Sequence, residues 1–336
     1  MTRAAWVTAG AALALGTLVA VAFAVGRFPV APADLARLVW ARLSGTPHGL
    51  STTVETVVFA VRGPRVVAAL VVGAALAGAG AAYQSLFRNP LVSPDILGVS
   101  AGAALGAILG IFFALDVWAI QGLAFVLGLA AVALAYAIAS SMRGHDPILV
   151  LVLAGVVLGA LFGACVALLK YLADPYNQLP AITYWLLGSL ASTTGGDVRS
   201  VLLPVGIGLA ALWLLRWRVT VLSLGDEEAA ALGVRPGPMR ALIVAGATLM
   251  TAAVVSISGI IGWVGLLVPH FARLLVGPDF RRLLPLAVLL GAAFMVGVDT
   301  VARTAARIEM PLGVLTAFIG TPIFLWLLAT ARRSWQ

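Results

Sequence analysis

The sequence predicts an all-α polytopic membrane protein with about ten transmembrane helices, and three observations support this fold class. Of the 336 residues, 62% are hydrophobic and 10% are charged, with a mean hydropathy of +1.08. A soluble domain of this composition would expose too much apolar surface to water. Apolar runs of about 20 residues, the length that crosses about 30 Å of hydrocarbon as a helix, recur from end to end. The pattern differs from the short alternating strands of a membrane β-barrel, and we expect one transmembrane domain over 1–336.

The apolar runs define the candidate spans, and the first is too long for the apolar core of a signal peptide, so we interpret it as an uncleaved helix. The expected spans are 5–26, 59–82, 96–114, 117–139, 147–170, 198–215, 238–258, 260–276, 283–303 and 312–330. Segments 32–43 and 178–191 are expected to form shorter helices outside the spans. With the N-terminus inside and an even number of spans, both termini are expected to be cytoplasmic.

The net charge of +8 comes almost entirely from arginine. Under this topology the inner loops carry a modest excess of basic residues, as the positive-inside rule predicts. No run of Lys and Arg indicates a nucleic-acid surface, so we expect no nucleic-acid partner. The outer side is also unusually basic.

The stretch "RNPLVSPD" (88–95) interrupts two very apolar runs and is predicted to be the cytoplasmic turn between the second and third spans. Pro90 and Pro94 exclude regular helix there, and Asn89 can satisfy loop backbone groups. Ser93 and Asp95 are candidate N-caps for the next span. That span carries a small residue at every fourth position, a pattern typical of close helix packing. The glycines of this ladder are Gly98, Gly102, Gly106 and Gly110.

Residues for catalysis or nucleotide binding are poorly represented. The three histidines (His48, His145 and His270) lie in separate segments without metal-ligand spacing. The one lysine does not belong to a phosphate-binding loop. Cys165 lies in an apolar run and is interpreted as a buried thiol. An ion-coupled secondary transporter remains an alternative, although Asp299 is its one candidate intramembrane acid and Arg303, four residues on, offers it an ordinary ion pair.

The segment "LSLGDEEAAALGVRPGPMR" (222–240) predicts a short helix with a defined start and end. Three acidic residues in its first turn complement the helix dipole. Gly233 can end the helix in the left-handed conformation, and the prolines at 236 and 238 stop its continuation. A solvated connector is the alternative, but a helix that docks in a partner's groove accounts better for these signals.

At this point the chain resembles the FecCD-type permease family, the membrane subunits of ABC importers for iron–siderophore complexes, haem and vitamin B12. The resemblance runs nearly end to end and rests on several blocks in the family's order. These are "RGPRVVAALVVGAALAGAGAAYQSLFRNPLVSPDILGVSAGA" (62–103), "KYLADPYNQLPAITYWLLGSLA" (170–191), "LGDEEAAALGV" (224–234), "GIIGWVGLLVPHFARLLVG" (259–277) and "MPLGVLTAFIGTPIFLWLL" (310–328).

The resemblance implies a homodimer in the bacterial inner membrane with its pathway on the two-fold axis. Two ATPase subunits are expected on the cytoplasmic side, where they use ATP and Mg, and a periplasmic substrate-binding protein on the other. No cofactor is expected on this chain. The segment 222–238 then resembles the element that couples to the ATPase. Its expected residues are Gly225, Asp226, Glu227, Glu228, Ala229, Ala230, Leu232 and Gly233.

By the same resemblance, Arg62, Arg65 and Arg303 are expected to dock the binding protein through its glutamates. Snorkelling to lipid headgroups is the alternative for these arginines. The expected cargo is an iron chelate, either siderophore-bound iron or haem, with cobalamin or an oxyanion such as molybdate as alternatives. His270 follows a proline near a span end and is interpreted as a structural residue rather than a haem ligand.

Overall fold

The computed structural model describes residues 3–47, 49–142 and 146–331, and within these ranges all regular structure is helical. Its elements are, in order, α1 (Arg3–Ala24), α2 (Pro32–Ser44), α3 (Thr52–Glu55), η1 (Thr56–Arg62), α4 (Gly63–Leu86), η2 (Pro94–Leu97), α5 (Val99–Phe112), α6 (Val117–Ser141), α7 (Pro147–Leu172), α8 (Gln178–Leu187), α9 (Gly195–Leu214), α10 (Arg216–Leu222), α11 (Asp226–Ala231), α12 (Pro236–Ser258), α13 (Val264–Val276), α14 (Phe280–Thr304) and α15 (Leu312–Ala331).

The predicted spans are confirmed with small shifts at their ends. Seven described helices are long and apolar enough to cross a membrane, and three shorter apolar ones, α5, α13 and the first part of α15, match the remaining expected spans. The helices outside the spans also form, as α2 and α8. Helix α10 was not predicted. It follows α9 after one residue and begins at Arg216, just beyond the end of the predicted span 198–215.

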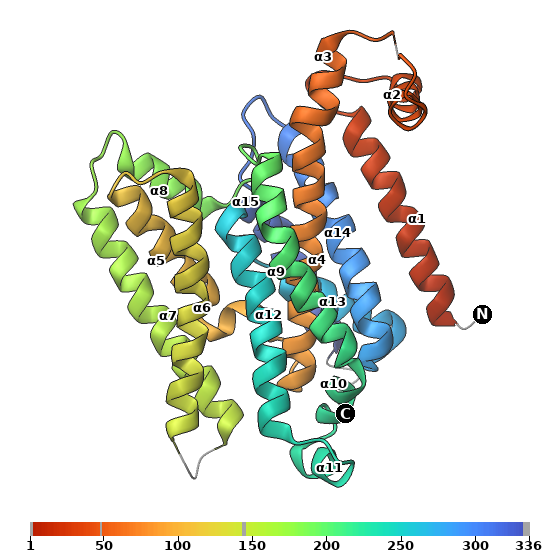
Figure 1. The fold of residues 1–336 in the computed structure, drawn as a ribbon. Coiled ribbons are helices and arrows are strands. Elements are labelled where there is room, and N and C mark those ends of the chain that lie inside the picture. The colour runs from red at the N-terminus through yellow and green to blue at the C-terminus, as the bar shows by residue number, and fades with distance from the viewer. Residues whose placement is uncertain (1–2, 48, 143–145, 332–336) are drawn as a thin grey trace.

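Helix α4 lies at the centre of the bundle and packs against α12, α13 and α14 (Figure 1). Its contact with α14 is the most extensive, and a Cβ on Gly73 would lie 2.1 Å from the carbonyl oxygen of Gly291. A Cβ on Gly80 would lie 1.9 Å from the carbonyl oxygen of Gly265 on α13. Only glycine permits such an approach of two backbones, so these positions set the packing of the core.

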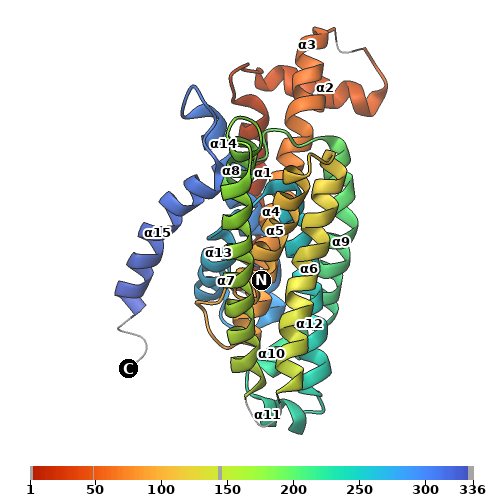
Figure 2. The ribbon, with the colours of Figure 1, turned by 90° about the vertical axis from the view of Figure 1, so that its left-hand side faces the viewer.

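Helices α5, α6 and α7 form a second group beside this core, joined to it mainly through α12. Helix α1 packs on α14 at the opposite side. Helix α15 leans away from the bundle in the turned view (Figure 2). Its contacts with the described residues are with α8, α13 and α14, and its Phe318 side chain is exposed.

The two ends of the bundle differ in what they carry. Helices α2, α3 and α8 lie at one end, which we call the α2 end, and α10 and α11 lie at the other, which we call the α11 end (Figure 1). The described N-terminal part of the chain starts at the α11 end. An even number of spans from there returns the chain to the same end.

The helix that precedes α4 widens into a π-helical segment, η1, just before Pro64. Proline lacks a backbone N–H, and its ring clashes with the carbonyl four residues earlier in a regular α-helix. The N–H of Gly63 accordingly donates to the carbonyl oxygen of Val58, five residues back.

Candidate functional site

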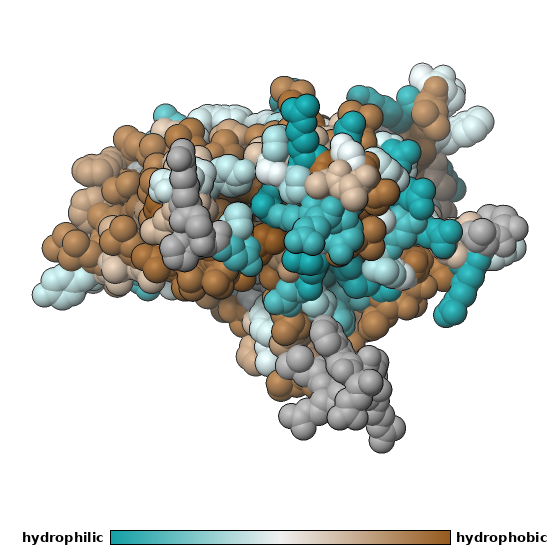
Figure 3. Space-filling model, turned by 90° about the horizontal axis from the view of Figure 1, so that it is seen from below, coloured by the Kyte–Doolittle hydropathy of each residue, from teal (hydrophilic) through white to brown (hydrophobic). Residues whose placement is uncertain are grey.

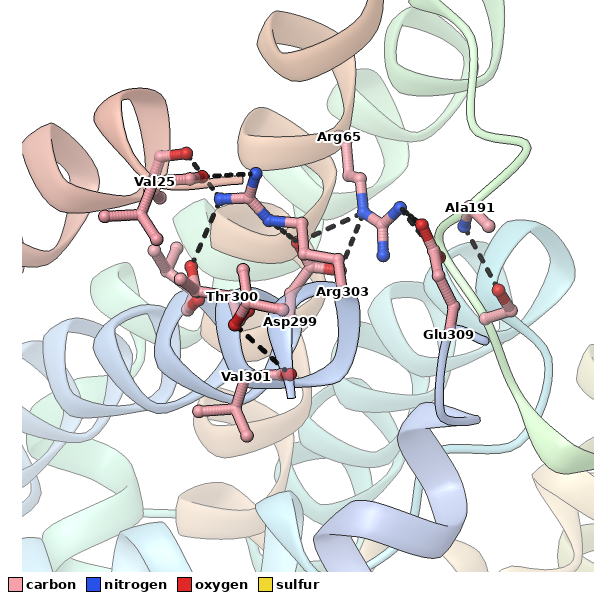
Figure 4. Close-up of polar contacts among 12 residues, drawn as sticks. Val25, Arg65, Ala191, Asp299, Thr300, Val301, Arg303 and Glu309 are labelled. Atoms are coloured by element: carbon pink, nitrogen blue, oxygen red, sulfur yellow. Dashed lines mark hydrogen bonds and ion pairs between the residues drawn. The ribbon is translucent and has the colours of Figure 1, made fainter. Parts of the chain in front are cut away.

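A cluster of five charged side chains lies at the α2 end, where α1, α4 and α14 meet. Arg65 bridges two carboxylates from distant parts of the chain (Figure 4). Its Nε donates to both oxygens of Asp299 at 2.9 and 3.1 Å, and its Nη1 donates to both oxygens of Glu309 at 3.0 and 2.9 Å. The side chain of Arg65 is 11% exposed and that of Asp299 is 2% exposed. Bidentate, charge-assisted geometry of this kind offsets the cost of burying the charges.

The other two arginines of the cluster bind backbone rather than side chains. Arg303 donates through Nη1 to the carbonyl oxygen of Val25 at 3.0 Å and through Nη2 to that of Ala22 (Figure 4). Arg62 donates to the carbonyl oxygens of Phe23 and Phe28. The last carbonyls of a helix have no partner within the helix and carry its negative dipole, so two guanidinium groups complete the end of α1.

The geometry gives Arg62, Arg65 and Arg303 a role within the chain, and their docking of a binding protein stays a prediction. A docking arginine must present its guanidinium group to a partner, whereas all three residues are buried and bonded within the chain. The local pair of Asp299 and Arg303 is also weaker than expected, with Nε and Oδ2 separated by 3.6 Å. The outer arginines therefore hold α1, α4 and α14 together in this structure.

The segment at the α11 end has the opposite character, because most of its charges face outward. Helix α11 begins after Gly225, which adopts a φ of 146°, and ends before Gly233 with a φ of 79°. The predicted left-handed end at Gly233 is confirmed, although α11 itself is only six residues long. Proline 236 does not merely stop the helix, as predicted, but begins α12 at its first position, where a missing N–H costs nothing.

Two contacts hold α11 against the bundle. In the first contact, Ala229 of α11 is completely buried against the bundle. The Nη2 atom of Arg240, on α12, donates to both oxygens of Asp226 at 2.9 Å, and the arginine side chain is 7% exposed. Glu227, Glu228 and Ala230 remain exposed. The sequence placed Arg240 among ordinary loop arginines, since nothing local links it to an acid fourteen residues earlier.

The exposed surface of the segment mixes acidic and apolar side chains. Leu224 and Leu232 flank α11 and are 59% and 54% exposed, next to Glu227 and Glu228. Seen from this end, hydrophilic side chains gather over the middle of the molecule and apolar side chains cover its flank (Figure 3). Exposed leucines rimmed by carboxylates are typical of a surface that a protein partner covers.

The predicted turn and glycine ladder lie in the structure as packing elements. The side chain of Asn89 accepts from the N–H of Leu91 at 2.9 Å, as expected for a turn-forming asparagine, and Pro90 follows it. Gly98 adopts a φ of 82° at the start of α5. A Cβ on Gly102, Gly106 or Gly110 would come within 2.8 Å of α6. These glycines therefore allow α5 and α6 to pack in close contact.

The capping prediction for this turn was wrong. The Ser93 side chain makes no capping bond, and Asp95 accepts from the Ser100 hydroxyl instead. Pro94 starts η2, a single 3₁₀ turn that packs among α4, α5, α6, α7 and α12. Its ring also contacts Gly265, where a Cβ would lie 2.7 Å away. The segment thus enters the bundle rather than remaining a surface turn.

A comparison of the sequence with protein families decides the identity of the fold. The model of the FecCD transport family matches residues 12–330. The chain belongs to the FecCD transport family. It is accordingly a permease subunit of an ABC importer, which works with ATPase and binding-protein partners, and a multi-pass membrane protein.

Characterised FecCD relatives differ in the compound that their names give. The chain is 38% identical over 315 residues to the molybdate import system permease MolB of Haemophilus influenzae, covering 94% of this chain and 93% of that one. It is 43% identical over 281 residues to the cobalamin import system permease BtuC of Halobacterium salinarum, covering 83% and 75%. A solved structure described as an inward-facing ABC transporter of metal-chelate type superposes with a TM-score of 0.87 at 36% identity, covering 96% and 98%.

The remaining polar residues that the sequence singled out in this FecCD permease are the three histidines and Cys165. His270 lies on α13 beside Arg273, which in turn donates to the Ser85 hydroxyl at 3.2 Å. Within the described residues no three His, Cys, Asp or Glu side chains gather as a metal site. Cys165 is only partly buried, which differs from the expected buried thiol. His48 and His145 lie outside the described residues.

Proposed function

We propose that this permease is one half of a homodimer that passes an iron chelate, either siderophore-bound iron or haem, from the periplasm to the cytoplasm. The α11 end faces the cytoplasm, with both termini, and α11 is the element that docks in an ATPase subunit. The binding protein delivers cargo at the α2 end. ATP and Mg act in the ATPase, and the membrane is the inner membrane of a bacterium.

The exposed, acidic α11 is the observation that carries this proposal. A short helix with both ends defined by left-handed or extended glycines is rigid, and it is fixed to α12 through the Arg240–Asp226 pair. Movement of a partner that grips Glu227, Glu228 and Leu232 is therefore transmitted to α12, which packs against the central helix α4. A solvated connector needs neither the ion pair to a buried arginine nor the exposed leucines.

The surfaces of α7 and α15 support the homodimer. Gly159 and Gly163 on α7 have open space where a Cβ would be, and Phe318 and Leu325 on α15 are exposed. A second copy packed at this side covers these surfaces and encloses a pathway between the copies. A pocket of about 620 Å³ between α8, α15 and the segment before α13 opens there, lined by Leu187, Trp263, Thr321 and other uncharged residues. Uncharged walls bind a passing cargo weakly.

The cargo is the finer part of the proposal. An iron chelate agrees with the metal-chelate type of the solved relative. Molybdate is the second candidate, because the relative named for it is similar over 94% of this chain. Cobalamin is the third, through the similarity to BtuC. Uncharged pathway walls do not distinguish these compounds, so selection is assigned to the binding protein.

Uptake by proteoliposomes tests the proposal. The vesicles hold the chain with its co-encoded ATPase and binding protein, with or without internal ATP, and are offered ferric siderophore, haem, cobalamin and molybdate in parallel. We expect ATP-dependent uptake of the iron chelate. Uptake of molybdate or cobalamin instead contradicts the cargo and keeps the importer.

A matched pair of variants tests the role of α11. We expect Glu227→Ala with Glu228→Ala to reduce ATP-dependent uptake at least tenfold. The control is Ser140→Ala with Ser141→Ala, at the end of α6 on the same side, where both hydroxyls bond only to their own helix. Uptake that proceeds without ATP, and is unaffected by the α11 variant, favours the ion-coupled secondary transporter.

A further inference from the structure

Helix α2 has two apolar faces on opposite sides, and only one of them is covered. The covered face carries Leu38 and Ala41, and Leu38 packs with Val58 and Phe23 at the junction of η1 and the end of α1. The opposite face, which we call the free face, repeats at intervals of three and four residues, so it forms one stripe along the helix. It consists of Ala36, Val39, Trp40 and Leu43.

The free face is exposed to an unusual degree for its composition. The side chains of Val39, Trp40 and Leu43 are 55%, 69% and 81% exposed in the described structure. A packed core accounts for one apolar face of an amphipathic helix, but not for a second face on the other side. Something outside this chain therefore covers it.

We propose that the free face of α2 is inserted into the outer leaflet of the bilayer that the chain spans, and that the arginines of α2 bind lipid phosphates there. By helical spacing Arg37 lies on a flank between the covered and the free faces, and Arg42 lies beside Leu38 on the covered side, with its guanidinium group over Phe59. Arginine stems cover apolar surface while their heads reach phosphate oxygens, and tryptophan is enriched at the membrane interface. Arg37 also lies 3.6 Å from Asp34, an exposed pair that leaves most of its donors available.

The position of α2 agrees with a lipid partner. It lies across the end of the bundle, seen nearly end-on in Figure 1 and from the side in Figure 2. Seven residues join it to α1, and the N–H of Val30 in this connection still bonds to the carbonyl oxygen of Ala24. Helix α2 is thus held directly at the level where α1 leaves the membrane, in the orientation of an interfacial helix.

The free face also continues a surface that already faces lipid. Along α1, Leu13 and Val21 are exposed, followed by Phe28 in the connection to α2. On the neighbouring η1, Phe59 is exposed, and the guanidinium group of Arg42 lies 5.9 Å from the centre of its ring. Exposed apolar side chains therefore lie on α1, on the connection and on η1 as well as on α2, which favours lipid over a protein partner.

Depth-dependent quenching in nanodiscs of phosphatidylethanolamine and phosphatidylglycerol tests the proposal. In a Cys165→Ser background, Val39→Cys and Leu43→Cys carry an environment-sensitive fluorophore on the full chain. The matched control is Thr53→Cys, exposed at the start of α3. Two quenchers are compared at each position: a phospholipid with a shallow acyl-chain nitroxide, and aqueous iodide. We expect the ratio of lipid quenching to iodide quenching to be at least threefold higher at 39 and 43 than at 53.

A second variant separates insertion from mere proximity. Trp40→Glu with Leu43→Glu is expected to lower lipid quenching at Val39→Cys at least twofold, since charged side chains oppose insertion. Equal quenching ratios at 39, 43 and 53 overturn the proposal. So does iodide access to 39 and 43 that ends only on adding the binding protein, or cross-linking of Leu43→Cys between two copies, because the free face then belongs to a protein interface. None of these readouts depends on the cargo or on transport.

Discussion

The two ends of this permease use charge in opposite ways. At the α2 end, Arg62, Arg65 and Arg303 are buried and donate their hydrogen bonds to carboxylate and carbonyl oxygens of this chain. At the α11 end, Arg240 is the one buried arginine among the described residues, and the acids Glu227 and Glu228 are exposed. Charge at the α2 end therefore stabilises the fold, whereas charge at the α11 end is available to a partner. The type of charged residue does not decide between these two roles. The hydrogen-bond partners that the folded chain places near each side chain decide it.

Removing the central acid of the outer cluster is expected to have the largest effect. Asp299→Ala leaves three arginines buried with one half-exposed carboxylate, and breaking a buried pair in this way costs about 3–5 kcal/mol. The measurement is thermal unfolding of the purified chain in nanodiscs. Arg65→Met combined with Asp299→Leu is the control for charge, and it is expected to recover at least half of the loss. An Asp299→Ala chain as stable as wild type would show that the cluster does not hold the helices.

The arginines that bind the end of α1 are expected to have an intermediate effect. Arg62→Gln and Arg303→Gln each remove bonds to buried carbonyl oxygens, at a cost of about 1–3 kcal/mol. Hydrogen exchange over residues 20–30 measures the opening of the end of α1, which should become faster in both variants. If instead the variants lose binding-protein affinity with unchanged exchange, docking returns as the role of these arginines.

At the other end, Arg240→Met is expected to loosen α11 with little change in overall stability. The partner Asp226 is half-exposed and water can solvate its carboxylate, so the loss is on the order of 1 kcal/mol or less. Hydrogen exchange over residues 225–234 should nevertheless rise several-fold, because one of the two contacts of α11 is gone. Unchanged exchange would mean that the burial of Ala229 alone fixes the segment.

The smallest effect is expected at Asp279, which caps α14 at the α11 end. Its carboxylate accepts from the side chain and the N–H of Arg281 and from Thr220, and these bonds hold its pKa below the ordinary value. A lowered folded-state pKa gives stability above the unfolded pKa, near 4, that is lost as the pH falls through the folded value. Asp279→Asn keeps a good N-cap, so it should cost only a few tenths of a kcal/mol at pH 7, and it should reduce the fall in stability between pH 5 and pH 3. An identical pH profile in the variant would contradict this role.

Much of the fold was predictable because a helix that spans a membrane needs a long continuous run of apolar residues, which is visible in the local sequence. Apolar run length located the spans to within a few residues, and Gly233 located the end of α11. The exceptions have local physical causes. Pro64 forces the π-helical η1, and α10 forms just beyond a predicted span, in a segment whose two arginines indicated a loop.

The charged pairings were not predictable, because they join distant positions. Arg65 meets Asp299 and Glu309 from 234 and 244 residues away, whereas the sequence offered Arg303 as the nearer partner of Asp299. Likewise, the close approach of Gly73 to Gly291 joins two helices that lie far apart in the chain. Such pairs exist only after the helices have packed.

The affinity of the ATPase subunit for this chain tests the central claim most directly. Nanodiscs holding the wild-type chain, the Glu227→Ala, Glu228→Ala variant or an Arg62→Gln chain are titrated with the co-encoded ATPase, and unfolding temperatures are measured in parallel. The account predicts at least tenfold weaker binding for the α11 variant at an unchanged unfolding temperature, and the reverse pattern for Arg62→Gln. Equal ATPase affinity in all three, or loss of affinity with Arg62→Gln alone, would contradict it.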